Sequence, residues 1–312
     1  MILDGLGSTK YEELFVVWNT VSAMLLEKGY VLVEPQVGEF VTSLDMAGIA
    51  LAVTFLDDEL EALWRAPADT PAFRKGTVRS TSAGKRIVRE SKTEEVFPEA
   101  SKASKAAAGF AVEAFRRVKT VLTEQEAELA RIDSVAGDGD HGQGMLKGAS
   151  FALDAISDAV SKGAGLGSAL RAAGNAWASK AGGTSGVLWG NALMRAGETL
   201  SDTAGSYSAS DMAAALRNAL ARIRELGKAG PGDKTMLDAL IPFVDVFEER
   251  TAAGVPAAEA WRLAADAAQD AAMKTAELLP KVGRARPQAQ RSLGTPDAGA
   301  VSLAVCFGAV LQ

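Results

Sequence analysis

The stretch Asp133-Ser-Val-Ala-Gly-Asp-Gly-Asp-His-Gly142 decides how this chain is interpreted, because it places acidic side chains between small ones. Asp133, Asp138 and Asp140 fall within eight residues, and the glycines between them let the backbone turn tightly. Carboxylates that converge on such a turn suit Mg²⁺, which proteins usually hold with one or two carboxylates, water and substrate phosphates. The residues alone leave an alternative, an Asp/Gly-rich connection between helices in which Asp140 is an N-cap.

The composition is that of a soluble globular protein. The chain has 312 residues, of which 48% are hydrophobic and 23% charged, and its net charge is −6. This charge argues against a nucleic-acid surface, which would need a basic face. It does not argue against an anionic substrate, because a bound divalent metal inverts the local field. The length suits one large domain or two ordinary ones.

Neither a secretory signal nor a membrane span is expected. The opening residues Met-Ile-Leu-Asp-Gly-Leu-Gly lack a basic region followed by an apolar core. The longest apolar run, Ala298–Leu311, falls short of the roughly 18 residues of a membrane-helix candidate and favours a buried helix. Cys306, the only cysteine, lies in that run and indicates a buried thiol in a reducing compartment. We therefore expect a cytoplasmic protein without a membrane partner.

Residues 1–75 mix helical and strand patterns over a short stretch. Helices are predicted over Glu12–Lys28 and Asp57–Trp64, and strands over Tyr30–Glu34 and Gly48–Phe55. A fragment of this size buries too little apolar surface to be stable without a partner or more chain.

The composition then changes twice. Residues 76–107 are rich in Ser, Thr, Lys, Arg, Glu and Ala without a sustained apolar period, which predicts a mobile interdomain linker. Over residues 108–312 apolar positions recur at helical spacing, as in Met145, Ala149 and Ile156, and no alternating strand pattern appears. About eight helices with Ala-rich faces predict a closely packed all-α bundle.

Three further glycine-rich loops interrupt the predicted helices. In Gly182–Gly186 the backbone N–H groups at a helix start and two hydroxyls make an anion cradle, although a helix cap explains the same residues. Within Gly227–Met236, Lys234 is a candidate phosphate ligand, although Asp233 or Thr235 could equally be ordinary helix caps. Within Gly283–Gly299, Arg284 is a candidate partner of phosphate oxygens.

Several common sites are not supported by the sequence. It contains neither a Walker-type P-loop nor a GxGxxG motif after a strand. His141 is the only histidine, which excludes a zinc site with several histidines and any mechanism that needs two. A single cysteine in an apolar run argues against cysteine catalysis.

Taken together, the loops of residues 108–312 resemble those of the nucleotide-binding L domain of dihydroxyacetone kinases. The matching pieces follow the family's order: Leu122-Thr123, Asp133 to Gly142, Gly182 to Gly186, Gly232 to Met236 and Gly283 to Gly299. The resemblance implies an eight-helix barrel with ATP or ADP at one end, and two Mg²⁺ ions held by Asp133, Asp138 and Asp140. The residues implied to line the nucleotide are His141, Gly142, Gln143, Gly144, Thr184, Ser185, Gly227, Met236, Arg284, Asp297 and Gly299.

Two departures from the family pattern stand in the last loop. Family members often read Gly-Arg-Ala-Ser-Tyr and Asp-Pro-Gly where this chain has Gly283-Arg-Ala-Arg-Pro and Asp297-Ala-Gly. Because of Arg286 and Pro287, the detailed nucleotide contacts of that loop are not carried over.

Residues 1–75 resemble the C-terminal tail of the same family's substrate-binding K domain. The matching pieces are Gly5-Leu-Gly, Tyr11-Glu-Glu-Leu, Val37 to Gly48 and Ala66 to Pro71. The order K tail, linker, L domain is that of the single-chain, ATP-dependent kinases. In that family a histidine earlier in the K domain holds the substrate ketone covalently, and this segment has none. The chain is interpreted as the C-terminal portion of a longer kinase that forms oligomers through K-domain contacts.

The leading hypothesis is ATP- and Mg²⁺-dependent phosphoryl transfer to a small ketose, such as dihydroxyacetone or erythrulose. This chain would supply the nucleotide-binding half and be inactive on the ketose without a complete K domain. One alternative is an L unit that holds ADP permanently and is rephosphorylated by a phosphotransferase-system protein. Another is a non-catalytic binding or regulatory remnant.

Overall fold

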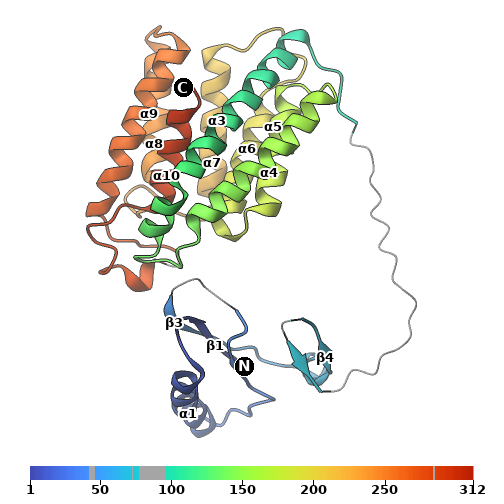
Figure 1. Ribbon diagram of the computed structural model, residues 1–312, viewed down its shortest axis with the longest axis vertical. Coiled ribbons are helices and arrows are strands. Elements are labelled where there is room, and N and C mark those ends of the chain that lie inside the picture. The colour runs from blue at the N-terminus through green and yellow to red at the C-terminus, as the bar shows by residue number, and fades with distance from the viewer. Residues whose placement is uncertain (42–45, 72, 77–95, 284, 312) are drawn as a thin grey trace. The chain divides into compact units, whose positions relative to one another are not determined.

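The chain folds into two compact units, residues 1–94 and 95–312 (Figure 1). The computed structural model describes residues 1–41, 46–71, 73–76, 96–283 and 285–311. Most of the protein is helical, as the sequence predicts. Most of the predicted linker lies outside the described residues.

The first unit is a small α/β body built on a three-stranded sheet. Its elements are β1 (Ile2–Gly7), α1 (Tyr11–Glu27), β2 (Gln36–Gly38), β3 (Ala47–Ala52), α2 (Asp58–Arg65), β4 (Ala68–Asp69) and β5 (Arg74–Lys75). The sheet has the order β2-β1-β3, with β1 parallel to β2 and antiparallel to β3, so that Leu3 stands between Val37 and Leu51. β4 and β5 form a separate antiparallel pair.

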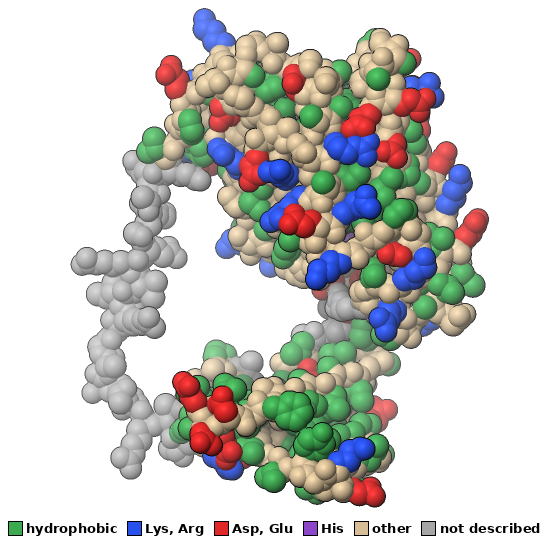
Figure 2. Space-filling view, turned by 180° about the vertical axis from the view of Figure 1, so that it is seen from behind, with side chains coloured by type: hydrophobic (Ala, Val, Ile, Leu, Met, Phe, Trp, Pro, Cys, Tyr) green, Lys and Arg blue, Asp and Glu red, His purple; other side chains and the backbone are tan. Residues whose placement is uncertain are grey.

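The core of this unit is thin. Among its described residues, Leu3 and Leu14 are the buried hydrophobic side chains. Many large apolar side chains are exposed instead, including Val31 at 88% and Phe55 at 75%. Figure 2 shows apolar side chains spread over the visible face of the unit. The expectation that residues 1–75 bury too little surface for independent stability agrees with this pattern.

One strand prediction in this unit was wrong and strand β1 was missed, whereas the predicted strand Gly48–Phe55 overlaps β3. Tyr30–Glu34 is irregular, and β2 begins only after Pro35. The carbonyl oxygens of Val33 and Glu34 accept hydrogen bonds from the indole N–H of Trp64, at 3.0 and 3.2 Å, in place of bonds from a neighbouring strand. β1 was missed because its two glycines and one aspartate are poor strand formers, and pairing with β3 overrides that preference.

The second unit is a closed barrel of eight α-helices within the described residues, as predicted. They are α3 (Lys102–Asp133), α4 (His141–Ser161), α5 (Leu166–Lys180), α6 (Gly183–Thr199), α7 (Ala209–Gly227), α8 (Leu237–Ala252), α9 (Ala257–Lys274) and α10 (Ala298–Ala309). Each helix packs against the next, and α10 closes the ring against α3. Two short 3-10 helices, η1 (Thr275–Glu277) and η2 (Arg286–Gln288), lie between α9 and α10.

The topology brings alternate connections to the same end of the barrel. Neighbouring helices joined by short connections are antiparallel. The connections α3–α4, α5–α6, α7–α8 and α9–α10 therefore share one end (Figure 1). These four are the glycine-rich loops that the sequence singles out. The barrel thus assembles one site from segments far apart in the chain.

Helix α3 begins earlier than expected. Residues 102–107 were predicted to belong to the linker, but α3 starts at Lys102. The Ser101 hydroxyl caps the helix by accepting a hydrogen bond from the N–H of Ser104 at 3.0 Å. The alanines that follow are strong helix formers, which explains why the helix extends over this polar stretch.

The interior of the barrel combines aromatic rings with small residues. Trp177 of α5 stacks on Trp189 of α6 with ring centroids 5.2 Å apart, and Phe243 of α8 packs edge-on against Trp261 of α9. Buried alanines from α4, α5, α9 and α10 let the helix backbones approach closely. Cys306 is buried in this core, as predicted, and burial raises the pKa of its thiol. In the described part of the chain, none of the helices combines the length and apolar character needed to cross a bilayer.

Candidate functional site

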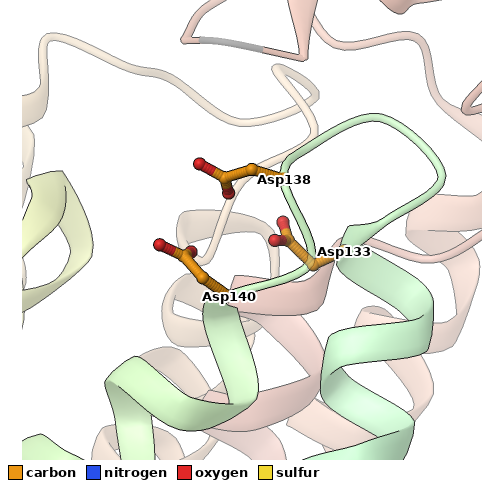
Figure 3. Close-up of side chains that lie close together, drawn as sticks. All are labelled: Asp133, Asp138 and Asp140. Atoms are coloured by element: carbon orange, nitrogen blue, oxygen red, sulfur yellow. The ribbon is translucent and has the colours of Figure 1, made fainter. Parts of the chain in front are cut away.

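The acidic loop brings its three carboxylates together. Asp133 is the last residue of α3, Asp138 lies in the loop, and Asp140 immediately precedes α4. One oxygen from each lies within 4.8 Å of the others. Figure 3 shows the three side chains directed toward a common space. We call this group the carboxylate cluster.

Small residues make the loop geometry possible. Gly139 adopts a left-handed backbone (φ +75°), which lets its N–H donate to Oδ2 of Asp133 at 2.9 Å. A Cβ on Gly137 would stand 2.5 Å from Oδ1 of Asp133. The Asp140 side chain does not cap α4, so the alternative reading of this residue as an ordinary N-cap has no support.

The donor set of the cluster fits a hard divalent cation. Three carboxylates from one short loop supply oxygen ligands, and neither histidine nor cysteine belongs to the group, so zinc-type ligation has no basis here. Mg²⁺ is typically bound through a small number of carboxylates, with its remaining positions left to water and phosphate oxygens. A residue larger than glycine at position 137 would collide with the Asp133 carboxylate, so glycine at this position leaves room for it.

A cavity of about 170 Å³ joins the cluster to the start of α6. Asp133, Asp140 and His141 line one side, and Gly182–Gly186 line the other. Gly182, at the N-cap of α6, has no side chain with which to cap the helix. The first backbone N–H groups of a helix lack intrahelical partners and favour an anion. The carboxylate cluster and an uncapped helix terminus therefore border the same small cavity.

A second cavity of about 270 Å³ lies among the four loops. It is lined by the predicted metal ligand Asp133 and by most of the residues predicted to contact the nucleotide: His141, Thr184, Ser185, Gly227, Met236, Asp297 and Gly299. Gly144 lines the smaller cavity with Thr184 and Ser185. The two cavities share Asp133, His141, Thr184 and Ser185, so they form one continuous candidate site.

Three predicted residues are not placed in these cavities. Gly142 is buried against α3, where a Cβ would stand 2.1 Å from the backbone oxygen of Glu126, so its role here is close packing. Gln143 is exposed and lines neither cavity. Arg284 lies outside the described residues.

Sequence reasoning missed the apolar side of the larger cavity. Ile132, Leu188, Ile223, Pro280 and Val282 all contribute to it. Ile132, Leu188 and Ile223 lie on helices, where an apolar residue at helical spacing indicates core packing and carries no sign of a ligand. They face the cavity because each lies near the end of its helix at which the four loops meet.

His141 is fixed within the site by α10. Its Nε2 lies 2.9 Å from the hydroxyl of Ser302. Burial lowers the pKa of His141, an effect opposed by the negative charge of Asp133 and by a hydrogen bond to the backbone of Ala298. The imidazole is therefore neutral near pH 7 in the metal-free protein.

Asp297 links the last loop to α10. Its Oδ1 accepts a hydrogen bond from the N–H of Ala300 at 2.8 Å, and its own N–H donates to the Thr275 hydroxyl at 2.8 Å. Burial raises the pKa of Asp297 to about 7, although the bond from Ala300 opposes the shift. A carboxyl group whose pKa is raised by burial thus lines the larger cavity.

The candidate phosphate ligand Lys234 has other partners in the structure. Its side chain is buried, and Nζ donates to the backbone oxygen of Ser292 at 2.7 Å and to that of Leu278 at 3.1 Å. These bonds oppose the phosphate-ligand interpretation of the residue.

Two family models match the chain in the order suggested by its loops. The Dak1 domain model matches residues 1–72, and the DAK2 domain model matches residues 135–312. The second match covers more than half of the chain and includes Asp138, Asp140 and the three later loops.

Similar proteins carry the same pair of segments within longer chains. The D-erythrulose kinase of Mycolicibacterium smegmatis is 54% identical over 311 residues, which cover 98% of this chain and 53% of that protein. The L-erythrulose kinase of Pectobacterium atrosepticum is 49% identical over 312 residues, covering 99% of this chain and 52% of that protein. The chain thus spans about half the length of the curated relatives it matches.

A solved structure shares the fold. The crystal structure of the dihydroxyacetone kinase from C. freundii in complex with AMP-PNP and Mg²⁺ matches with a TM-score of 0.51 and 24% identity, over 99% of this chain and 52% of that one. The two family-model matches and the relatives together show that the chain belongs to the dihydroxyacetone kinase family, of the single-chain type with Dak1 and DAK2 segments.

Proposed function

We propose that this chain is the ATP- and Mg²⁺-binding part of a kinase that phosphorylates a small ketose. The observation that carries the proposal is the position of the carboxylate cluster beside the uncapped N-terminus of α6. A metal site and a helix terminus facing one small cavity suit a polyphosphate, which needs cations and N–H donors together. Relatives named as erythrulose kinases support a ketose as the acceptor.

The residues of the site divide into two groups by what they would contact. Asp133, Asp138 and Asp140 would hold two Mg²⁺ ions, which when bound neutralise phosphate charge. The start of α6, with Thr184 and Ser185, would orient the phosphates through backbone N–H groups and hydroxyls. Phosphoryl transfer needs little covalent chemistry from the protein, so positioning and charge neutralisation suffice.

The larger cavity is the proposed place of the nucleoside. Its apolar lining, with Leu188, Ile223 and Val282, offers a surface for a base, and Asp297 and Met236 line the same cavity. The shared lining residues connect this cavity to the one beside the carboxylate cluster. One ligand with an apolar ring system and a charged tail therefore suits both cavities.

Erythrulose is the first acceptor to test, with dihydroxyacetone second. Relatives at 54%, 49% and 48% identity are named as erythrulose kinases, whereas the triokinases stand at 28%. The described site does not itself distinguish the two ketoses, because the acceptor would be held by the K domain.

The first unit is proposed to be part of that substrate-binding domain. Its exposed apolar residues surround a groove of about 280 Å³ lined by Leu56, Leu60, Leu63 and Trp64. An apolar surface of this kind marks a contact with further protein. We propose that the remainder of a Dak1-type domain covers it, and that this domain also forms the oligomer contacts.

It follows that the chain alone is proposed to be inactive on a ketose. The only histidine, His141, lies between the carboxylate cluster and α10, so a covalent ketone adduct on it is not expected. Without a domain that places the hydroxyl in line with the γ-phosphate, an advantage of about 7–11 kcal/mol at best is lost.

The test is a coupled assay of ADP release with erythrulose or dihydroxyacetone, followed by mass spectrometry of the sugar phosphate. The chain is measured alone and with a complete Dak1 domain from a close relative. An Asp138→Asn variant is the matched control. We expect sugar phosphate only when both parts are present and Asp138 is intact.

Each other outcome has a distinct meaning. Sugar phosphate formed by the chain alone, at the rate seen with the added domain, would refute the need for that domain. Tightly held ADP that is rephosphorylated only by a phosphotransferase-system protein would favour the alternative donor. Mg²⁺·ATP binding without turnover under any combination would favour a binding or regulatory role.

A further inference from the structure

The connection between α9 and α10 forms one wall of the larger cavity. Pro280, Val282, Ser292, Thr295 and Pro296 all line the cavity from this segment. Apart from the two short 3-10 helices, its described residues form no regular structure. We call residues 278–283 and 285–297 the cavity wall. Its shape therefore depends on turn bonds within the segment, such as that from the N–H of Thr295 to Ser292, together with bonds from side chains outside it.

Lys234 joins two distant points of the cavity wall to the loop before α8. Its Nζ donates to the oxygen of Leu278 at 3.1 Å, to the backbone oxygen of Ser292 at 2.7 Å and to the Ser292 hydroxyl at 3.3 Å. An ammonium group has three N–H donors, so these acceptors use its full capacity. A phosphate in the cavity would have to displace one of them.

The backbone conformation and the surrounding loop also fix the position of Lys234. Its backbone is left-handed (φ +58°), an uncommon conformation for a residue with a Cβ, and the side chain is only 5% exposed. The carboxylate of Asp238 fixes the same loop by accepting bonds from the N–H groups of Gly232 and Thr235. Burying a charged ammonium group costs free energy, and this cost is tolerated only if the hydrogen bonds of the group are satisfied.

Other bonds support the ends of the cavity wall. The N–H of Gly294 donates to Ala276, and that of Asp297 donates to Thr275, both on the short helix η1. The N–H of Lys281 donates to the oxygen of Asp233 at 3.2 Å. The two bonds to η1 fasten the wall near α9, and the bond from Lys281 fastens it to the loop before α8. Among the described side chains, Lys234 alone ties Leu278 and Ser292 to one atom.

We infer that Lys234 is a positioning residue for the nucleotide, which acts by holding the cavity wall through the backbone oxygens of Leu278 and Ser292. This inference rests on the proposed function, since it assigns the cavity to a nucleotide. Lys234 does not touch the phosphates in this account. Its loss would loosen the wall and leave the carboxylate cluster, which is built from α3, α4 and their loop, unchanged.

The test compares Lys234→Met with Lys281→Met. Methionine keeps the length of the side chain but donates no hydrogen bond to the carbonyl oxygens. Lys281 is a matched control because it carries the same charge on the cavity wall, is exposed, and reaches only Asp233, at 3.6 Å. Three quantities are measured on the full chain: ATP affinity in Mg²⁺, Mn²⁺ affinity without nucleotide, and hydrogen exchange of the cavity wall.

We expect Lys234→Met to weaken ATP binding by about tenfold or more, the loss expected when hydrogen bonds of a charged group are removed. Hydrogen exchange in the cavity wall should become faster, and Mn²⁺ affinity should stay within about twofold of the wild type. Lys281→Met should resemble the wild type in all three measurements. In Lys234→Ala, n-propylammonium should restore ATP affinity by supplying the missing donors, whereas tetramethylammonium, which has no N–H group, should not.

Unchanged ATP affinity and unchanged wall exchange in Lys234→Met would overturn the inference. So would a parallel loss of Mn²⁺ binding, which would show a general structural role. If Lys234→Met does not fold, Lys234→Leu, which also donates no hydrogen bond, is measured instead by the same criteria. A wild-type chain that binds no nucleotide would refute the proposed function, while the exchange data would still decide whether Lys234 holds the wall.

Discussion

The backbone N–H of Gly139 donates a 2.9 Å hydrogen bond to Oδ2 of Asp133, so the loop after α3 folds back onto the residue that ends the helix. This bond holds one carboxylate of the cluster in place while the chain continues to Asp138 and Asp140. The proposed metal site is therefore built within a single short segment, Asp133 to Asp140. The small residues of this loop are as important for its geometry as the three aspartates.

The first prediction follows from the space around Asp133. In Gly137→Ala, the new methyl group would stand 2.5 Å from Oδ1 of Asp133 and displace the carboxylate. We expect Mg²⁺-dependent ATP affinity to fall between about tenfold and about a hundredfold, the range for disturbed metal-ligand orientation. Gly205→Ala is the control, since a Cβ there meets nothing within 4 Å. Equal ATP affinity of the two variants in calorimetry would contradict the proposed metal site.

A second prediction separates a metal ligand from a helix cap. Asp140 makes no side-chain capping hydrogen bond, so Asp140→Ala should abolish Mg²⁺-dependent ATP binding without the stability loss that removal of a helix cap causes. Asp154→Ala, at an exposed position of α4, should change neither quantity. If Asp140 were only a helix cap, its replacement would have the opposite effects. Its removal would cost about 1 kcal/mol of stability and leave ATP affinity intact, which urea unfolding and calorimetry would reveal.

The third prediction concerns the pH dependence of stability in magnesium-free buffer. Burial raises the pKa of Asp297 from 3.8 to about 7 in the folded protein. The folded state thus binds a proton more tightly than the unfolded state, and this contribution to stability falls as the pH rises from about 4 to about 7. Asp297→Asn keeps an oxygen for capping Ala300 but does not titrate. In urea unfolding, the free energy of unfolding should fall more between about pH 5 and about pH 8 for the wild type than for Asp297→Asn. Equal decreases for the two proteins would exclude a contribution from Asp297.

Much of the helical unit could be predicted from the sequence, because burial on one face leaves a strong periodic pattern. Met145, Ala149 and Ile156 are all buried on α4, as their spacing indicates. In the first unit, pairing between distant segments decides the structure. β1 exists because β2 and β3 lie on either side of it, and neither its composition nor its neighbours in sequence reveal that.

The candidate site was predictable where its residues share one loop. Asp133, Asp138 and Asp140 lie together because few residues separate them. Lys234 was misread because a lysine in a glycine-rich loop suggests a phosphate, and only the fold reveals the carbonyl oxygens of Leu278 and Ser292 around it. The apolar lining was not predictable, since cavity-facing and core-facing positions on a helix show the same periodicity.

The measurement that tests this account most directly is calorimetric titration of the full chain with ATP, after removal of bound nucleotide. With Mg²⁺ present we predict saturable binding at one site, and ADP should bind under the same conditions. Chelation of the metal should abolish the heat, because the carboxylate cluster would then repel the phosphates. No heat with either nucleotide in Mg²⁺, or equal affinity with and without the metal, would contradict the assignment of this barrel as a Mg²⁺·ATP site.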